Sequence, residues 1–380
     1  MKLTKEEIRR YSRHLIMPEV GMKGQEKLKK GSVLIIGAGG LGSPLGLYLA
    51  AAGVGHIGLV DFDVIDYSNL QRQILYNTED VGKSKVETAK ERLLKINPHI
   101  KVTAFPVAFS SENAMEISED FDIIIDGTDN FPTRYLANDL SILTGKKNVF
   151  GSVFRFDGQV TVFGDPDGPC YRCLYPDPPP NGMVPSCSEG GVLGILPGII
   201  GIMQATEAIK LITGEGNPLV GRLLTFDALG MKFKELKIKK DPDCVICSSK
   251  RSIHKLIDYQ HFCGVQPHSA DEGAHPLEIA PGELNDLLKK GQKPFLLDVR
   301  TPEENEICAI DGSILIPLAK MASHLSEIPL DRDIVVICKV GSRSMDAVRL
   351  LQGWGYKKVK SLKGGVDQWA EEIDPNMPRY

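Results

Sequence analysis

Four cysteines form two pairs with the spacing of metal ligands. Cys170-Tyr-Arg-Cys173 and Cys244-Val-Ile-Cys247 each place two thiols three positions apart. Together they supply four sulfur ligands for a tetrahedral Zn²⁺, and four cysteines leave no open position for catalysis. We therefore predict a structural zinc site that ties together two segments 71 positions apart, from 173 to 244. Two independent redox-active or buried cysteine pairs are the alternative.

Another cysteine, Cys338, stands between an apolar strand-like run and a helical pattern, in Cys338-Lys339-Val-Gly-Ser-Arg343-Ser. Backbone N–H groups of such a loop point at the sulfur, and the helix N-terminus with Lys339 and Arg343 favours a thiolate or persulfide. Four residues separate Cys338 from Arg343, one fewer than in the phosphate-binding loop of protein phosphatases. This tighter loop suits sulfur, so we predict Cys338 as a nucleophile and Arg343 as its cation. A buried strand-end cysteine is the alternative.

Cys187 lies in a segment rich in proline and glycine, residues 175–191. An exposed thiol in such a loop is a candidate nucleophile or thioester carrier. An incidental surface cysteine is the alternative reading.

A glycine-rich turn predicts a nucleotide site. Gly37-Ala-Gly39-Gly40-Leu-Gly42 follows the apolar run 33–36 and precedes a helical pattern, and a second apolar run ends in Asp61. Free N–H groups at a helix N-terminus bind phosphate, and the acid suits a ribose. These features alone fit NAD as well as they fit ATP.

The residues that follow favour ATP. Arg72 and Lys85 can neutralise a triphosphate and a pyrophosphate leaving group, which NAD does not require. Asp129 follows the apolar run 121–126, at the edge where open α/β sheets bind ligands, and a carboxylate there suits Mg²⁺. A helix N-cap is the alternative for Asp129. The further predicted nucleotide-binding residues are Asp63, Ser68, Asn69, Leu70, Gln71 and Asn130.

The elements that must position these residues form two α/β patterns. Alternating strand-like and helical runs as far as residue 126 predict a parallel sheet with helices on both faces. A hairpin pattern at 151–163 adds antiparallel strands. We expect a Rossmann-like mixed sheet in a domain over 1–250, a linker over 251–276 and a small α/β domain over 277–380.

Composition sets the remaining expectations for this chain of 380 residues. Its hydrophobic content of 42%, charged content of 25% and net charge of −4 are ordinary for a soluble protein and give no reason to expect nucleic acid or an anionic membrane as partner. The start lacks the apolar core of a signal peptide, and no run approaches ~20 uninterrupted apolar residues. With eight cysteines and no secretory signal, we expect a reducing, cytoplasmic location.

On these motifs the chain resembles the ThiF/MoeB family of ubiquitin-activating-like adenylyltransferases, fused to a C-terminal rhodanese domain as in the MoeZ type. The resemblance covers about 1–250 through GAGGLG, DFD, SNLQRQ, GKSK, DGTDN and both cysteine pairs. It covers about 277–380 through Leu297-Asp-Val-Arg300, the Cys338 loop and Gly364-Gly365. Two small departures are Lys339, where arginine is frequent, and Asn305, where an aromatic residue is common.

The resemblance implies an ATP-dependent enzyme that adenylates the C-terminal Gly-Gly carboxylate of a ubiquitin-like sulfur-carrier protein. A persulfide on Cys338, loaded by a cysteine desulfurase or another persulfide donor, would then convert the carrier to a thiocarboxylate. Arg13 resembles an arginine that reaches the nucleotide of a partner subunit, which implies a homodimer. Cys187 matches a loop cysteine proposed to form a thioester or to resolve an acyl disulfide. The alternatives are an NAD-dependent oxidoreductase and a non-catalytic scaffold with a rhodanese-like binding module.

Overall fold

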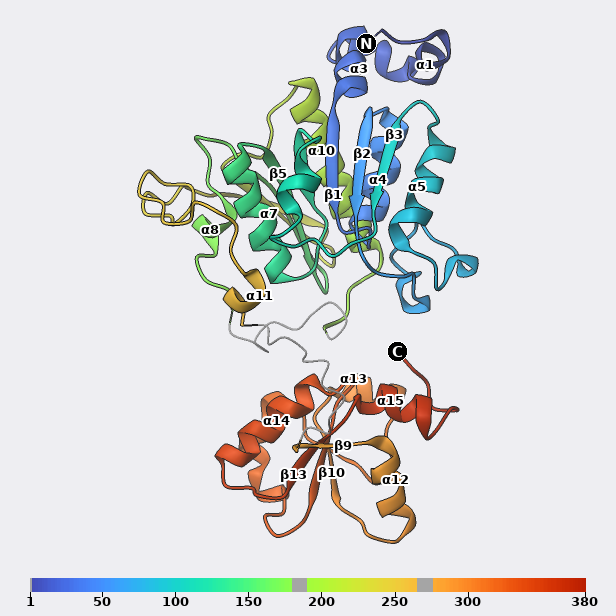
Figure 1. The fold of residues 1–380 in the computed structure, drawn as a ribbon, viewed down its shortest axis with the longest axis vertical. Coiled ribbons are helices and arrows are strands. Elements are labelled where there is room, and N and C mark those ends of the chain that lie inside the picture. Colours follow the sequence, from blue (N-terminus) through green and yellow to red (C-terminus); the bar gives the residue numbers. More distant parts are fainter. Residues whose placement is uncertain (1, 180–189, 265–275) are drawn as a thin grey trace. The chain divides into compact units, whose positions relative to one another are not determined.

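The computed structural model describes residues 2–179, 190–264 and 276–380. The chain divides into two compact units, Met1–Pro267 and His268–Tyr380. Figure 1 labels the elements of both units. Cys187 lies outside the described residues.

An eight-stranded mixed sheet forms the centre of the first unit, in the order β3-β2-β1-β4-β5-β6-β7-β8. The first five strands along the chain run parallel, and β6 to β8 continue the sheet antiparallel. The predicted Rossmann-like mixed sheet is confirmed. Its strands are β1 (Ser32–Ile36), β2 (His56–Val60), β3 (Lys101–Phe105), β4 (Ile123–Asp126), β5 (Lys147–Phe154), β6 (Asp157–Phe163), β7 (Arg222–Asp227) and β8 (Lys232–Lys237).

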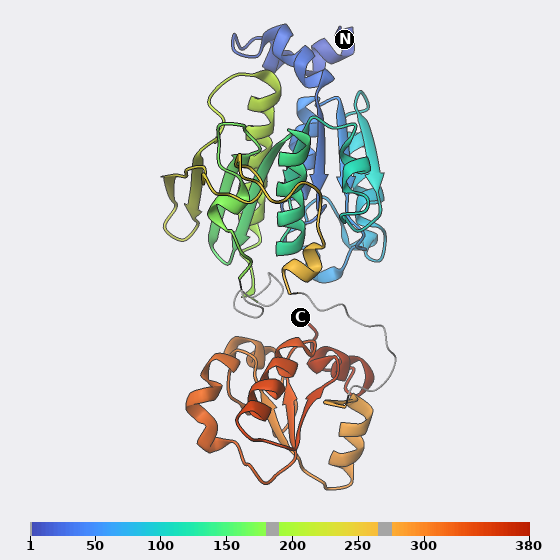
Figure 2. The same ribbon diagram turned by 60° about the vertical axis from the view of Figure 1, so that its left-hand side comes forward.

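Alternating side chains of the central strand explain why helices cover both faces of this sheet. Val33 and Ile35 of β1 enter one core cluster, whereas Leu34 and Ile36 enter the other. Because a strand directs successive side chains to opposite faces, an apolar run of this kind must be covered on both sides, as Figures 1 and 2 show. The helices are α1 (Lys5–Arg10), α2 (Ser12–Leu15), α3 (Gly21–Lys30), α4 (Gly42–Ala52), α5 (Lys85–Ile96), α6 (Ala114–Ser118), α7 (Phe131–Thr144), α8 (Tyr171–Leu174), α10 (Ile195–Thr213) and α11 (Tyr259–Phe262).

Helix α10 is long and apolar enough, by length and composition alone, to cross a membrane. It packs against α4, β5 and β6. The amide of its buried Gln204 donates to the backbone oxygens of Asp126 (2.7 Å) and Val149 (3.0 Å). These contacts are those of a core helix of the first unit.

The first unit extends further along the chain than the sequence pattern predicts. Tyr259 and Cys263 belong to one of its core clusters, and α11 contacts α7. Residues assigned to a linker from 251 onward therefore pack on this unit as far as Gly264, where the described segment ends. A single helical turn carries too few residues to show a periodicity, which explains why the sequence pattern missed it.

The second unit is a five-stranded parallel sheet in the order β11-β10-β12-β13-β9. Apolar clusters cover both of its faces, so the small α/β domain is confirmed. Its elements are β9 (Glu278–Ile279), α12 (Pro281–Lys289), β10 (Phe295–Asp298), α13 (Pro302–Ile307), β11 (Ile314–Leu315), a 3₁₀ segment (Leu318–Glu327), β12 (Ile334–Ile337), α14 (Ser342–Gly353), β13 (Val359–Leu362) and α15 (Gly365–Glu372).

Candidate active sites and a candidate metal centre

A cavity of about 480 Å³ lies at the carboxyl ends of β1, β2 and β4 in the first unit. Parallel strands end together at this edge, which is where open α/β sheets bind ligands. Most of the predicted nucleotide-binding residues line it: Gly37, Gly39, Gly40, Asp61, Asp63, Ser68, Asn69, Arg72, Lys85, Asp129 and Asn130.

The glycines of the turn have two different roles. Gly37 has φ +93°, a conformation that favours glycine. Gly42 does not line the cavity; a Cβ on it would lie 2.1 Å from the backbone oxygen of Gly37. Gly42 therefore lets the first turn of α4 close against the loop, which leaves the helix N-terminus facing the cavity.

Asp61 is held in place by the backbone. Its two carboxylate oxygens accept N–H groups from Ala38 and Asp63, each at 2.9 Å. Burial raises the pKa of Asp61, against the lowering effect of Lys85 and these hydrogen bonds. A carboxylate fixed in this way at the cavity wall can accept hydrogen bonds from sugar hydroxyls.

Two cations face the cavity from different elements. Lys85, at the start of α5, forms an ion pair with Asp63 at 2.8 Å, and only 7% of its side chain is exposed. Arg72 donates to the backbone oxygen of Ser68 at 3.0 Å. Asn69 ends the short 3₁₀ turn that supports Arg72. Two positive charges and an amide thus line one cavity, a set suited to a polyphosphate.

The alternative role for Asp129, a helix N-cap, belongs instead to its neighbour. The side chain of Asn130 accepts the N–H of Thr133 and caps α7. The turn before Asp129 is fixed by Asp126, whose Oδ1 accepts the N–H and the hydroxyl of Thr128. Asp129 lines the cavity, where its carboxylate is the hard oxygen ligand that Mg²⁺ prefers.

Besides Gly42, three further predicted residues lie away from the lining of this cavity. Leu70 and Gln71 are not among the residues that line it. Arg13 belongs to α2, which packs on α3, and α3 leads into the amino end of β1. Since the cavity is at the carboxyl ends of the strands, Arg13 lies at the opposite edge of the sheet, as the position of α3 in Figure 1 illustrates.

Sequence reasoning missed several apolar residues of the cavity wall. Val107 and Phe109 follow the carboxyl end of β3, and Val153, Val192 and Pro197 come from the second half of the unit. The position of Val107 and Phe109 after a predicted parallel strand was a usable signal, because all such ends meet at one edge.

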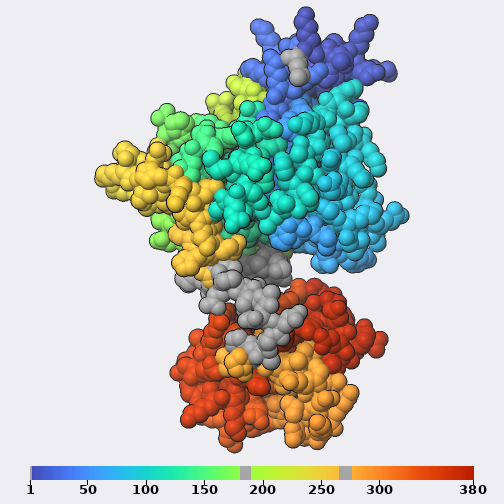
Figure 3. All heavy atoms as spheres, viewed as in Figure 1, coloured from blue at the N-terminus to red at the C-terminus, as the bar shows by residue number. Residues whose placement is uncertain are grey.

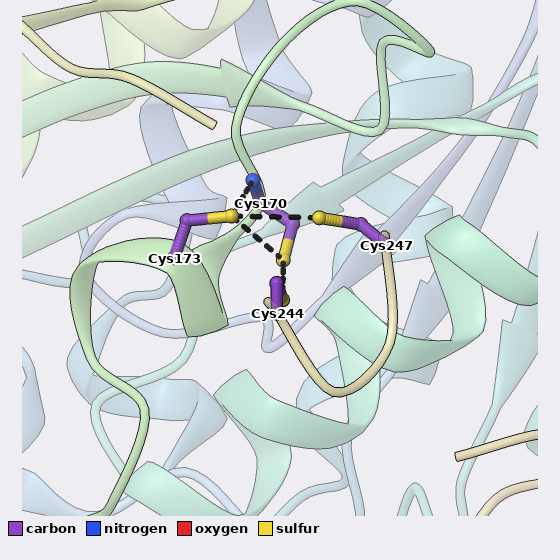
Figure 4. Close-up of side chains that lie close together, drawn as sticks. All are labelled: Cys170, Cys173, Cys244 and Cys247. Atoms are coloured by element: carbon purple, nitrogen blue, oxygen red, sulfur yellow. Dashed lines mark hydrogen bonds between the residues drawn. The ribbon is translucent and has the colours of Figure 1, made fainter. Parts of the chain in front are cut away.

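The four cysteines predicted to bind zinc meet in space, as Figure 4 shows. Their sulfur atoms all lie within 4.8 Å of one another, and all four are free thiols. The sulfurs are 3.6 Å apart for Cys170 and Cys244, and 3.4 Å apart for Cys173 and Cys247. Tetrahedral Zn²⁺ with bonds of ~2.3 Å places its ligands about 3.8 Å apart, so this donor set fits zinc.

A buried ion pair lies directly beside this cluster. Arg172, between the first two cysteines, pairs with Asp139 of α7 at 2.8 Å, and both side chains are almost fully buried. Tyr259 of α11 donates to the same carboxylate at 2.9 Å. The segment carrying the second cysteine pair lies on the surface (yellow in Figure 3). The cluster therefore joins this surface segment to the turn at Cys170–Cys173, and the ion pair of Arg172 with Asp139 holds that turn against the core helix α7.

In the second unit, Cys338 follows β12 and is fully buried. Its sulfur accepts the N–H of Gly341 at 3.1 Å and lies 3.3 Å from the hydroxyl of Ser344. The backbone oxygens of Cys338 and Lys339 accept N–H groups from the first turn of α15. A Cβ on Gly365 would lie 2.3 Å from both oxygens. The loop carbonyls are thus satisfied by α15, while the loop directs an N–H group at the sulfur.

The guanidinium of Arg343 forms a bidentate ion pair with Glu304, at 2.6 and 2.7 Å. Burial raises the pKa of Glu304. Arg343, the N–H of Thr301 and the hydroxyl of Tyr380 have a larger, opposite effect and lower this pKa to about 2. We predicted Arg343 as a cation for Cys338, and sequence spacing did not reveal Glu304 as its partner. Asn305 stands where the rhodanese pattern commonly has an aromatic residue. Its amide donates a hydrogen bond to Asp298 at 3.1 Å.

Comparison with known proteins finds a family match for each of the two units. Residues 11–246 match the ThiF family, and residues 280–372 match the rhodanese-like domain. The probable adenylyltransferase/sulfurtransferase MoeZ of Mycobacterium tuberculosis is 49% identical over 100% of this chain and 96% of its own length. The sulfur carrier protein adenylyltransferase of Thermus thermophilus is 51% identical, over 70% of this chain and 100% of its own length.

A crystal structure of E. coli MccB with MccA-N7isoASN has the same fold as the first unit. It superimposes with a TM-score of 0.58 at 24% identity, over 63% of this chain and 75% of MccB.

From the two family matches and the MoeZ relative, the chain belongs to the ThiF family, carries a rhodanese-like second domain, and is an enzyme of the adenylyltransferase and sulfurtransferase class.

Proposed function

We propose that the first unit adenylates the C-terminal Gly-Gly carboxylate of a ubiquitin-like sulfur-carrier protein. The observation that carries this proposal is the cavity in which Arg72, Lys85, Asp61 and Asp129 meet at the carboxyl edge of the sheet. The Thermus thermophilus relative, named for activity on a sulfur carrier protein, matches 70% of this chain over its whole length.

The cavity residues divide the work of the reaction. The N–H groups of the glycine loop face phosphate and Asp61 faces the ribose. The carrier carboxylate attacks the α-phosphorus of ATP, and pyrophosphate leaves with the bonding electrons. Arg72 and Lys85 stabilise the negative charge that grows on the leaving group. Asp129 would hold Mg²⁺, which neutralises phosphate charge when bound.

The second unit supplies the sulfur in this proposal. A persulfide donor such as a cysteine desulfurase loads Cys338. The terminal sulfur of that persulfide attacks the acyl adenylate and displaces AMP, which forms an acyl disulfide with Cys338. A second thiol, for which Cys187 is our candidate, then attacks Cys338 and releases the carrier thiocarboxylate. A disulfide between the two cysteines remains, and a cellular thiol must reduce it before the next cycle.

Further parts of the proposal concern assembly, metal and location. A homodimer would place Arg13 of one subunit at the nucleotide of the other. Zn²⁺ in the cysteine cluster would have a structural role, because four sulfur ligands leave no site for substrate. We propose a cytoplasmic location, and neither nucleic acid nor a membrane is needed as partner.

Carrier-dependent exchange of labelled pyrophosphate into ATP tests the adenylation step. The wild-type chain should catalyse exchange only with a carrier that ends in Gly-Gly, and a carrier lacking the last glycine is the matched control. Asp129→Asn should lose most of the exchange, whereas Cys338→Ala should keep it. Absence of exchange with every Gly-Gly carrier tried would refute the adenylation proposal, and a hydride transfer to NAD by the same protein would favour the oxidoreductase alternative.

A further inference from the structure

Tyr380 is the centre of a hydrogen-bonded cluster beside the Cys338 loop. Its hydroxyl accepts an N–H from Arg300 and donates to Oε1 of Glu304, both at 3.0 Å. The ammonium nitrogen of Lys339 lies 4.6 Å from the centre of its ring, within the range of a cation–π contact. The Tyr380 side chain thus contacts Lys339 directly and reaches Arg343 through Glu304.

The groups around Tyr380 are themselves fixed. Arg300 is fully buried and pairs with Asp298 at 2.6 Å, which sets the direction of its remaining N–H groups. Both oxygens of Glu304 are occupied: Oε1 by Arg343 and Tyr380, Oε2 by Arg343 and the N–H of Thr301. Side chains with this many partners have little freedom to rearrange.

Burial raises the pKa of Tyr380 above its usual value. Arg300 lowers this pKa, and the nearby carboxylate of Glu304 raises it. The phenol therefore remains protonated near neutral pH and can donate to Glu304. This donation helps keep the Glu304 carboxylate in the plane in which it receives both N–H groups of Arg343.

We propose that Tyr380 is a positioning residue for sulfur transfer, which fixes Lys339 through its ring and Arg343 through Glu304. The inference rests on the proposed role of Cys338 as the sulfur-carrying nucleophile. An anionic sulfur donor and a thiolate repel each other as they meet, so cations held near the loop lower the energy of their encounter.

Thiosulfate is a suitable probe for this step. The Cys338 thiolate attacks the outer sulfur of thiosulfate, the S–S bond breaks, and sulfite leaves with the electron pair. Cyanide then removes the terminal sulfur as thiocyanate and restores the thiolate. Both half-reactions balance without a further oxidant or reductant.

The decisive comparison is the KM for thiosulfate in full-length Tyr380→Phe and wild type. Losing the hydroxyl removes one of the hydrogen bonds that hold Glu304, and so loosens the support of Arg343, while the ring under Lys339 stays. We expect KM to rise about ten-fold, the size of one lost hydrogen bond to a charged group, with a smaller change in kcat. Tyr380→Ala, which also removes the ring, should raise KM further. Adding Glu304→Gln to Tyr380→Phe should have less than the additive effect.

Tyr356→Phe is the matched control in the same unit. Its hydroxyl donates to the backbone oxygens of Leu325 and Ile328, at 3.2 and 3.1 Å, so the substitution also removes buried hydrogen bonding. It should reduce stability yet leave the thiosulfate KM unchanged, which separates positioning from a general loss of structure.

The proposal is overturned if Tyr380→Phe has the wild-type KM, or if Tyr356→Phe raises KM to the same extent. If Cys338 is not the sulfur-carrying nucleophile, Cys338→Ala would still produce thiocyanate. This result distinguishes failure of the Cys338 role from failure of the Tyr380 proposal. Carrier-dependent pyrophosphate exchange should be unchanged in Tyr380→Phe, since that reaction belongs to the other unit.

Discussion

Replacing Asp139 by asparagine should destabilise the first unit strongly. The carboxylate accepts three N–H contacts from Arg172, at 2.8 to 3.2 Å, and a hydrogen bond from Tyr259. The exposed fractions of the Arg172 and Asp139 side chains are 1% and 0%. The asparagine would leave a buried guanidinium without a counter-charge. Removing one partner of a buried pair costs about 3–5 kcal/mol.

That cost is large compared with the total stability of a domain, about 5–15 kcal/mol. With a urea m-value of about 2 kcal/mol/M, the midpoint for unfolding of the first unit should fall by about 2 M. Both tryptophans, Trp354 and Trp369, belong to the second unit. Tryptophan fluorescence therefore follows the second unit, while near-UV circular dichroism of the tyrosines and calorimetry report mainly on the first.

Asp243→Asn provides the matched control, because Asp243 pairs with Lys250 on the surface, with exposed fractions of 68% and 75%. An exposed pair contributes about 0–1 kcal/mol, so this variant should unfold like wild type. The tryptophan signal should be unchanged in both variants. An Asp139→Asn protein whose first unit unfolds at the wild-type urea concentration would refute our account of the Arg172 pair.

Three further predictions test other parts of the structure. Cys244→Ser should lose bound zinc and lower the unfolding midpoint of the first unit, measured by metal analysis and calorimetry; zinc retained at one equivalent per chain would contradict the four-cysteine site. Gly42→Ala should abolish pyrophosphate exchange, because its Cβ would meet the Gly37 backbone oxygen at 2.1 Å, whereas Gly198→Ala, with nothing within 4 Å, should be active and as stable as wild type or slightly more so. The lowered pKa of Glu304 stabilises the folded second unit at pH values above the ordinary carboxyl pKa, and this stability is lost as pH falls through that value toward about 2. Tryptophan-monitored unfolding should therefore show a steeper acid loss in wild type than in Glu304→Gln, and parallel curves would count against the Arg343 pair.

Local patterns predicted the elements of both units well. The sequence pattern predicts a strand at 33–36 and helices at 43–52 and 343–353, and β1, α4 and α14 match these bounds to within one residue. These elements bury one stripe or two faces, and such burial leaves a periodic signal in the sequence. The meeting of the two cysteine pairs was equally predictable, because their spacing is that of zinc ligands.

Contacts between distant residues were not predictable in this way. Glu304 and Arg343 are 39 positions apart, and Tyr380 is 76 positions from Glu304. The loop motif predicted Arg343 as a cation for Cys338, but it could not show that the carboxylate of Glu304 also pairs with Arg343. For the same reason Gly42, Leu70 and Gln71 were grouped with the nucleotide-binding residues, although only their neighbours line the cavity.

The most direct test of the central claim is the mass of the carrier after incubation with ATP, a persulfide donor, a thiol reductant and this protein. Our account predicts a carrier in which one C-terminal oxygen is replaced by sulfur. With Cys338→Ala it predicts accumulation of the acyl adenylate without thiocarboxylate. Formation of the thiocarboxylate at the wild-type rate by Cys338→Ala would contradict the account.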